Sequence, residues 1–295
     1  LGAVSDEAIP NMAAVTKIED GQATEVARTW EFEKEHNPDP NVLDSHPYGI
    51  TVGRDGWLWV ADAGGNTLLK VDPASGQIDL VALFGGLSGP LPNPNRGGRM
   101  QMDPVPTAVA FDGEGNIYVS LLPGFPFPPG SGKVVKVSAH GTARDYATGL
   151  VMVTDLRTGP DGELYAVQMA QPTEQGPVPN SGSVVRVKEG NASEVILSGL
   201  SFPTSIDFNE AGDAYVIRNG VGAPGSGEVV MYAGLTAMEG TPLAAAAAPA
   251  PPEAMPVTGA APLNLGMIVA AAGAVLLGGG LLLGRRWAAS PARKD

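Results

Sequence analysis

Apolar and polar residues alternate along the chain in short runs that recur with a long period. Four fourteen-residue segments begin at Pro47, Pro106, Val153 and Pro203. Each contains an alternating apolar run, a glycine-bearing turn and a second apolar run with an aromatic residue. A period of two on both sides of a tight turn predicts a β-hairpin. The chain therefore carries four hairpins spaced 47 to 59 residues apart.

Two further short strands are predicted after each hairpin. The third strands are 68–72, 134–138, 184–188 and 229–233, and the fourth strands are 78–84, 143–150 and 193–200. Four antiparallel strands per unit of this length are typical of a propeller blade. A solenoid of helix pairs would show a 3.6-residue period, and a β-sandwich would not repeat one motif four times. We therefore predict an all-β fold, a β-propeller of four-stranded antiparallel blades.

The predicted propeller spans residues 1–240. Its first and last residues each lie in the middle of a blade. Residues 14–19 match the third-strand pattern and residues 23–30 match the fourth, whereas no convincing fourth strand follows Ala237. Five blade periods are thus visible, two of them incomplete. We expect a six-bladed parent, with seven blades as the alternative, whose first strands precede Leu1.

Two stretches resemble a known family of propellers. ADAGGNTLLKVDPASGQ (61–77) resembles NHL-type blades, which are related to the SMP-30-like propellers. NPDP (37–40) followed by SHPYGITVGRDGWLWVADAGGN (45–66) resembles the ScyD/ScyE family, named from scytonemin-pigment gene clusters. The resemblance covers about residues 10–235 and implies the propeller fold. It implies no established catalytic residues.

The C-terminal part of the sequence predicts a membrane anchor. A Pro/Ala-rich linker occupies 241–262, an apolar segment 263–284 and a basic tail 285–295. The twenty uncharged residues 265–284 would form a helix of about 30 Å, the thickness of the hydrocarbon core. The basic tail favours a cytoplasmic C-terminus, which leaves the propeller extracellular. We expect a single-pass protein whose partner through 265–284 is the membrane.

The linker also contains a short motif. The sequence Met255, Pro256, Val257, Thr258 and Gly259, followed by an apolar span and a basic tail, resembles a sortase sorting signal, whose common form begins with Leu. The resemblance implies a sortase-like transpeptidase as partner, cleavage between Thr258 and Gly259, and anchoring to the cell wall. The alternative is a chance P-x-T-G in a tract rich in Pro and Gly.

The amino-acid composition limits the kinds of ligand and partner that the protein can bind. The chain has no cysteine, which excludes disulfides and thiolate metal sites. Its net charge is −13, and an acidic surface repels phosphate backbones, so we predict no nucleic-acid partner.

The lengths of the connections predict which face binds a ligand. The connections between first and second strands and between third and fourth strands are short and share one face. Those on the other face are long, at 35–45, 85–103, 120–132, 167–183 and 217–227. Long loops on one side of a rigid scaffold concentrate binding residues. The alternative is that these loops pack only on each other.

Candidate ligand-binding residues lie on this loop-rich face. They are Asp44, His46, Asp62, Asn66, Asp103, Phe125, Phe127, Asp155 and Gln168. Carboxylates and amides converging on the channel could hold Ca²⁺ through hard oxygen ligands, although the more frequent role of Asp and Asn is to cap turns. The two phenylalanines are candidate apolar anchors for a partner, or else the local core of a long loop. We expect no cofactor other than this possible Ca²⁺.

No nucleophile elbow, zinc-binding helix or P-loop is present. We therefore predict a non-enzymatic surface module that binds a small ligand or surface protein. The alternative is a metal-dependent hydrolase of the lactonase or strictosidine-synthase-like type, with its site on the channel axis. It requires three or more of the candidate side chains within about 3 Å of one axial point. A display stalk without a pocket is a third possibility.

Overall fold

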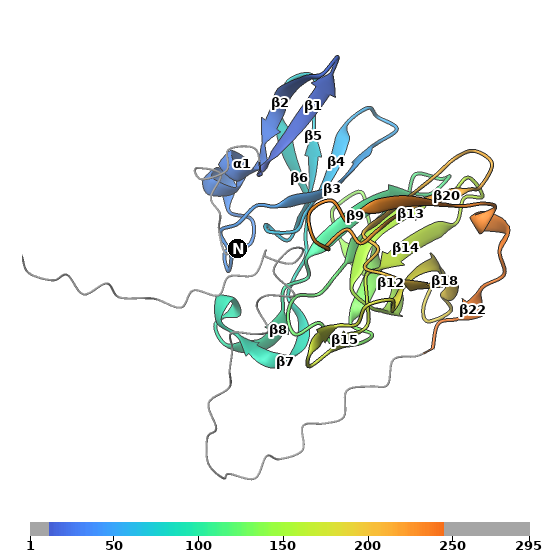
Figure 1. The fold of residues 1–295 in the computed structure, drawn as a ribbon. Coiled ribbons are helices and arrows are strands. Elements are labelled where there is room, and N and C mark those ends of the chain that lie inside the picture. Colours follow the sequence, from blue (N-terminus) through green and yellow to red (C-terminus); the bar gives the residue numbers. More distant parts are fainter. Residues whose placement is uncertain (1–11, 245–295) are drawn as a thin grey trace, which may run out of the picture.

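A computed structural model describes residues 12–244 of the 295-residue chain and shows a β-propeller with four blades (Figure 1). The first blade consists of β3 (Pro47–Val52), β4 (Leu58–Asp62), β5 (Thr67–Val71) and β6 (Ile78–Leu83). The second consists of β9 (Pro106–Phe111), β10 (Ile117–Leu121), β11 (Gly132–Val137) and β12 (Ala143–Leu150). The third consists of β13 (Val153–Thr158), β14 (Leu164–Gln168), β17 (Gly182–Val187) and β18 (Glu194–Leu200). The predicted all-β propeller fold is confirmed.

The fourth blade has three described strands, β19 (Ser205–Phe208), β20 (Ala214–Arg218) and β21 (Glu228–Tyr232). After β21 the chain turns through η2 (Leu235–Ala237) to β22 (Thr241–Pro242), which pairs with β18 of the third blade. The C-terminal segment therefore extends the third blade to five strands and does not complete the fourth.

Local turn chemistry explains the repeated hairpins. Gly56, at φ 80°, and its equivalent Gly212, at φ 86°, occupy the left-handed region that glycine adopts without steric cost. In the second blade, the carboxylate of Asp112 accepts hydrogen bonds from the backbone N–H groups of Glu114 and Asn116, at 3.0 and 2.9 Å. Such a side-chain cap fixes the turn and with it the register of the strands.

The N-terminal part of the described chain forms a partial unit beside the first blade. β1 (Ala14–Glu19) and β2 (Gln22–Arg28) pair in antiparallel fashion, as the third and fourth strands of a blade do. The predicted strand 23–30 was too long, because Thr29 begins the helix α1 (Thr29–His36). This helix also takes the first residues of the segment 35–45 that the sequence predicted to be a loop.

Two other predicted loops contain secondary structure. The segment 85–103 forms a hairpin of β7 (Leu87–Asn93) and β8 (Arg99–Met102), with η1 (Pro94–Arg96) at its turn. The segment 167–183 contains the short ladder of β15 (Pro172–Thr173) and β16 (Gly176–Pro177). These connections are ordered elements on the side of the disc opposite the hairpin turns (Figure 1).

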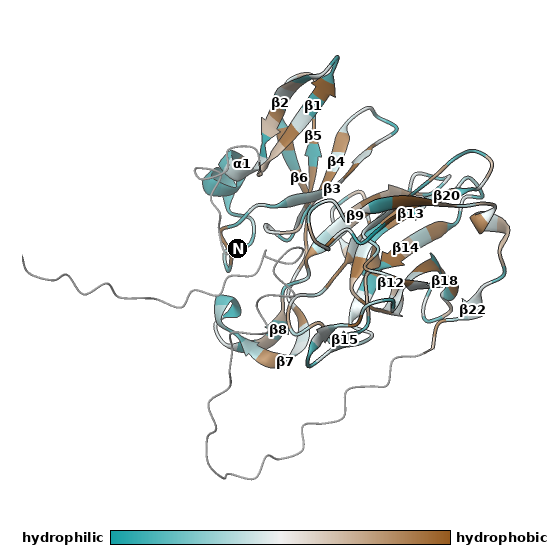
Figure 2. Ribbon diagram, viewed as in Figure 1, coloured by the Kyte–Doolittle hydropathy of each residue, from teal (hydrophilic) through white to brown (hydrophobic). Residues whose placement is uncertain are grey.

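The core lies between neighbouring blades. One aromatic residue of each of the first three blades, Trp59, Tyr118 or Tyr165, packs in a cluster with an aliphatic residue of the next blade's inner strand. Brown, apolar segments accordingly follow the middle of the sheets in Figure 2. Such packing buries one face of every sheet and removes its apolar surface from water. The strands β3, β9, β13 and β19 come first in their sheets and lie next to each other.

The predicted linker 241–262 lies mostly outside the described residues, as do the sorting motif 255–259, the apolar segment 263–284 and the basic tail 285–295. Within residues 12–244, no helix is long and apolar enough to cross a membrane.

Candidate functional site on the inner strands

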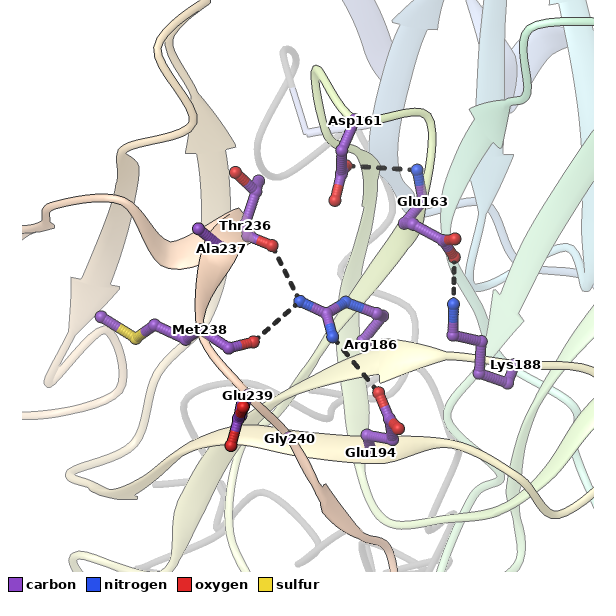
Figure 3. A pocket seen from close by; sticks show the side chains of 10 residues that line it. All are labelled: Asp161, Glu163, Arg186, Lys188, Glu194, Thr236, Ala237, Met238, Glu239 and Gly240. Atoms are coloured by element: carbon purple, nitrogen blue, oxygen red, sulfur yellow. Dashed lines mark hydrogen bonds and ion pairs between the residues drawn. The ribbon is translucent and has the colours of Figure 1, made fainter.

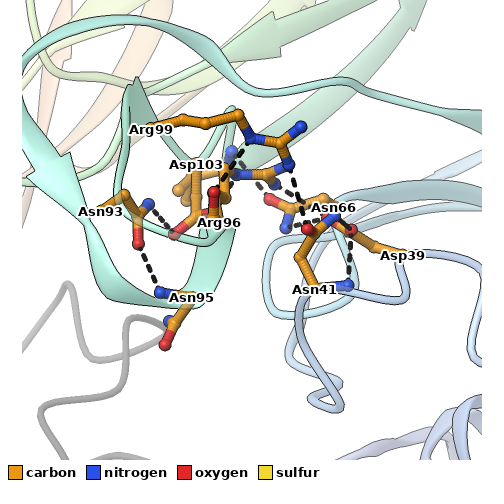
Figure 4. A network of polar contacts seen from close by, with 9 residues as sticks. Asp39, Asn41, Asn66, Asn93, Asn95, Arg96, Arg99 and Asp103 are labelled. Atoms are coloured by element: carbon orange, nitrogen blue, oxygen red, sulfur yellow. Dashed lines mark hydrogen bonds and ion pairs between the residues drawn. The ribbon is translucent and has the colours of Figure 1, made fainter.

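Asp103 and Asn66, two of the predicted ligand-binding residues, belong to a buried polar network that joins the loop before β3 to the hairpin of β7 and β8 (Figure 4). At its centre the guanidinium of Arg96 donates to Asp103 at 2.6 Å and to Asp39 at 2.8 Å. Asn66 donates to Asp39 at 3.1 Å and accepts from the backbone N–H of Val105 at 3.3 Å. These side chains hold the loops together.

Electrostatics agree with a structural role for this network. Burial alone raises the pKa of the Asp39 carboxyl, but hydrogen bonds from Asn41 and Arg96 outweigh it and hold that pKa below its usual value. Arg96 is 3% exposed. A buried guanidinium held by two carboxylates has its charge and its donors satisfied, so it has little capacity left for a ligand.

Asp62, Asp44 and His46 form a second buried cluster where β4 ends beside α1. Asp62 accepts hydrogen bonds at 2.6 Å from the hydroxyl of Ser45, at 2.6 Å from the backbone N–H of His46 and at 3.1 Å from that of Gly65. Nε2 of His46 lies 3.3 Å from an Asp44 carboxylate oxygen. Asp62 thus caps backbone N–H groups, which is the alternative to Ca²⁺ binding that the sequence analysis gave for these carboxylates.

The carboxyl of Glu33 in α1 completes this second cluster and was not predicted from the sequence. Burial, followed by the negative charge of Asp62, raises the pKa of Glu33 to about 8. Burial also raises the pKa values of Asp44 and Asp62. Glu33 is therefore mostly protonated at neutral pH, and it contacts the other side chains without adding a full negative charge.

Gln168, Phe127 and Phe125 lie elsewhere on the loop-rich face. Gln168 accepts from the backbone N–H of Val151 at 2.6 Å and donates to Ser183 at 2.8 Å. Phe127 packs against a cluster of buried apolar side chains, whereas Phe125 is 63% exposed. Of the two phenylalanines, Phe125 alone is exposed, and its role as an apolar anchor stays a prediction.

Asp155, the remaining predicted residue, belongs to a group of polar side chains on the inner strands. Its carboxylate accepts hydrogen bonds from the hydroxyl of Ser205 at 2.6 Å and from the backbone N–H groups of Leu156 and Ile206, at 2.9 and 3.0 Å. Three donors saturate most of this carboxylate and link β13 to β19. Asp155 is thus held in place between two inner strands.

Arg157 and Tyr48 are the reactive groups that the sequence analysis missed. Arg157 follows Asp155 on the same strand, with its Nε 3.6 Å from an Asp155 oxygen, and its Nη1 donates to the hydroxyl of Thr51 on β3 at 3.2 Å. The Nε of Arg157 is buried and finds no hydrogen-bond acceptor within residues 12–244. The side chain as a whole is 33% exposed, so a small solute can reach its outer part. We call Tyr48, Thr51, Asp155 and Arg157 the axial cluster.

The charges of the axial cluster define what it can bind. Burial and the negative charge of Asp155 raise the pKa of Tyr48 to about 12, although 42% of the Tyr48 surface is exposed. The phenol is therefore a neutral donor at physiological pH. Arg157 carries a permanent positive charge and has N–H groups to spare. Together they offer donors for a carbonyl, carboxylate or other electron-rich oxygen.

The predicted candidates do not build a metal site. They are divided among the Arg96 network, the Asp62 cluster and the axial cluster. Among the residues that the structure describes, no three His, Asp or Glu side chains are grouped so as to hold a metal ion. Among residues 12–244, no group of carboxylates and imidazoles thus supports the Ca²⁺ site or the channel-axis metal centre that the sequence suggested.

A polar cavity of about 560 Å³ lies on the opposite, short-turn side of the third blade (Figure 3). Arg186 points into its centre and donates to the carbonyl oxygens of Thr236 and Met238, at 2.9 and 3.1 Å, and to Glu194 at 3.2 Å. On the other wall Lys188 donates to Glu163 at 2.6 Å. Because these charged groups are paired with one another, the cavity serves chiefly to attach the C-terminal segment to the blade.

Comparison with known proteins leaves the family of this chain open. No family model matches the chain, and no curated protein does. Solved structures with a similar fold include a gluconolactonase from Xanthomonas campestris (17% identity, 63% of this chain and 57% of that one, TM-score 0.42). A catalytically inactive virginiamycin B lyase from Staphylococcus aureus with quinupristin has 16% identity over 74% of this chain and 62% of that one, with a TM-score of 0.39. The nidogen/laminin complex has 13% identity over 74% of each chain, with a TM-score of 0.45.

This chain therefore spans less than two thirds of the length of that gluconolactonase and that lyase. The comparison corrects one prediction. The sequence analysis inferred a protein without chemistry of its own because familiar catalytic motifs are absent, yet proteins of similar fold include a gluconolactonase and lyases. A lack of familiar motifs is thus no ground for excluding catalysis on this fold.

Proposed function

We propose that the chain is an enzyme that acts on a small oxygen-rich substrate, such as a lactone, in the axial channel of the propeller. The observation that carries this proposal is the state of Arg157. Its guanidinium is 33% exposed on an inner strand, is oriented by Thr51 and Asp155, and donates among residues 12–244 a single hydrogen bond, from Nη1 to Thr51. A permanent cation whose outer N–H groups are not used by the fold is suited to bind an oxygen on which negative charge develops.

The proposed chemistry uses only groups of this chain. Water adds to the ester carbonyl carbon of the lactone, and the negative charge moves to the carbonyl oxygen. Arg157 and the phenol of Tyr48 donate hydrogen bonds to that oxygen, which stabilises the transition state more than the ground state. Asp155 keeps Arg157 in place. The ring C–O bond then breaks, and the proton released by the attacking water passes through the solvent to the leaving alkoxide, which gives the hydroxy acid.

The test is hydrolysis of five- and six-membered lactones, followed by acid release at constant pH in the presence of EDTA. Arg157→Gln should lower kcat/KM by about 10²- to 10³-fold, the usual effect of losing one donor to a developing oxyanion. Tyr48→Phe should lower it less, because a neutral donor is the weaker partner. Arg144→Gln, on the exposed edge of β12, is the matched control and should leave hydrolysis unchanged.

Two results would count against this proposal. If no lactone is hydrolysed, or if Arg157→Gln hydrolyses lactones at the full rate, the axial cluster is not the active site. If EDTA abolishes hydrolysis and Ca²⁺ restores it, the metal-dependent alternative is correct and its ligands lie outside residues 12–244.

We also propose that this enzyme is displayed at the cell surface and is a relative of the NHL and ScyD/ScyE propellers. Residues 37–40, 45–66 and 61–77 support the relationship through their resemblance to those blades. The apolar segment 265–284, the basic tail 285–295 and the motif 255–259 support anchoring to the membrane or, after transpeptidation, to the cell wall.

A further inference from the structure

One position of the blade repeat has a different environment in the first blade than in the other three. Val109, Leu156 and Ile206 occupy this position on β9, β13 and β19, and they are 1%, 0% and 1% exposed. Ile50 occupies it on β3 and is 46% exposed. The residue type is retained while the burial is lost. An aliphatic side chain at this point of the repeat therefore lacks the partner that its three equivalents have.

The missing partner can be identified from the later blades. Val109 shares a buried cluster with Trp59, Leu156 shares one with Tyr118, and Ile206 shares one with Tyr165. In each pair the aromatic residue lies on the second strand of the preceding blade. Ile50 should accordingly pack against an aromatic residue on the second strand of a blade that precedes β3.

The partial unit beside the first blade supplies only the outer half of such a blade. Val15 of β1 and Ala27 of β2 pack with Val60, Leu69 and Val71 of the first blade and cover its outer strands. The same face of the inner strand stays open.

Three side chains mark the open region. Ile50 and Val52 alternate along β3 on this face and are 46% and 65% exposed, and Tyr48, at a bulge beside them, is 42% exposed. Neighbouring exposed apolar side chains on an inner strand are unusual for a surface in water.

The backbone has a matching gap. A third strand of a complete blade pairs with the second strand on one side and with the fourth on the other, as β5 does with β4 and β6. β1 holds the third position and pairs, among the described strands, with β2 alone. Its other edge has no partner among the strands of residues 12–244, and the N–H and C=O groups of such an edge favour the addition of a strand.

We propose that the surface formed by β3 and the free edge of β1 binds an antiparallel strand pair, supplied by the part of the polypeptide that precedes Met12. The second strand of the pair hydrogen-bonds to β1, and its aromatic residue covers Ile50. The first strand lies inside it along the channel. Chain order favours this source, because in each complete blade the first two strands come directly before the third. The pair would also form one wall of the channel beside Tyr48.

The test restores the strand pair by grafting. A copy of residues 106–131, which includes the hairpin of β9 and β10 and its connection to β11, replaces residues 1–13 of the chain. The graft should raise Tm by at least about 5 °C, since it buries an aliphatic and an aromatic side chain. It should also slow amide hydrogen exchange of β1 at least tenfold.

Two variants show whether the graft binds at the proposed surface. Tyr118→Asp in the grafted copy removes the aromatic side chain of the contact. Ile50→Asp in the host removes the aliphatic side chain against which it would pack. Each should cancel most of the gain in Tm and in β1 protection. Val229→Asp, at an exposed position of β21 in the fourth blade, is the matched control and should keep both gains.

Other outcomes overturn the proposal. A graft that gives no protection of β1, or protection that survives Ile50→Asp, places the strand pair elsewhere. Light scattering of the 295-residue chain tests a second copy as occupant. A dimer that dissociates on dilution and is lost in Ile50→Asp would show that another copy covers β3. Neither result depends on lactone hydrolysis.

Discussion

The hydroxyl of Thr107 donates a hydrogen bond of 2.9 Å to the backbone carbonyl of Val153 and so joins the inner strands of two neighbouring blades. Thr107 is 1% exposed, so in its absence no water would reach that carbonyl. Thr107→Val keeps the shape of the side chain but leaves the carbonyl without a donor. We expect a loss of about 1–3 kcal/mol in the free energy of unfolding, measured by urea titration. Thr142→Val, in an exposed turn, should cost less than about 0.5 kcal/mol, and equal losses would contradict the role given to Thr107.

Arg96 should be the most sensitive arginine of the loop-rich face. Arg96→Met removes the cation that lies between Asp39 and Asp103 and leaves both carboxylates buried without it. Breaking a buried ion pair in this way costs about 3–5 kcal/mol. Arg99→Met, three residues later and exposed, should cost at most about 1 kcal/mol. Unfolding in urea distinguishes the two, and similar costs would show that the network contributes little.

Glu33 should make the protein less stable as the pH rises. Its pKa is about 8 in the folded chain, against an ordinary value of 4.5, so the folded state retains a proton that the unfolded state loses. The free energy of unfolding should therefore fall between pH 4.5 and pH 8, by up to about 1.4 kcal/mol per pH unit.

Replacing this carboxyl tests that expectation. Glu33→Gln cannot ionise, so the slope of stability against pH should become smaller in the same range. Some slope should remain, since the pKa values of Asp44 and Asp62 are raised as well. Glu35→Gln, exposed on the same helix, should retain the full slope. Urea titrations at four or five pH values provide the measurement.

The anchoring hypothesis predicts a defined mature C-terminus. If residues 255–259 are a sorting signal, surface-extracted protein should yield a peptide that ends at Thr258, joined through its carboxyl to an amine. Mass spectrometry of proteolytic peptides detects this directly. Recovery of an intact 285–295 tail from the same fraction would exclude transpeptidation and would leave the membrane segment as the proposed anchor.

The strands could be predicted from the sequence because their signals are local. A turn such as that of Asp55 and Gly56 fixes a hairpin within fourteen residues, and β12, predicted at 143–150, ends where it was expected to end. The hairpin of β7 and β8 was missed because Pro90, Pro92 and Pro94 are typical of a loop. Its position depends on Arg96, whose acceptor Asp39 lies 57 residues earlier in the chain.

The axial cluster could not be predicted either, because its contacts join residues that are far apart in the sequence. Asp155 was among the candidate residues predicted on the loop-rich face, whereas Arg157 was not predicted. Its hydroxyl partner, Thr51, is 106 residues away. Only the arrangement of the inner strands brings these two side chains together, and a spacing of that length leaves no trace in local periodicity. The lengths of the loops indicate a face of the propeller but cannot identify individual residues on it.

The short β22 determines how the propeller would respond to a pulling force. A load applied beyond Leu243 reaches the fold first through two residues paired with β18 and through the hydrogen bonds from Arg186 to Thr236 and Met238. These few contacts can break one after another, and the inter-blade core is not stretched until they have. Under tension, the C-terminal segment would thus detach first, while the blades keep their packing.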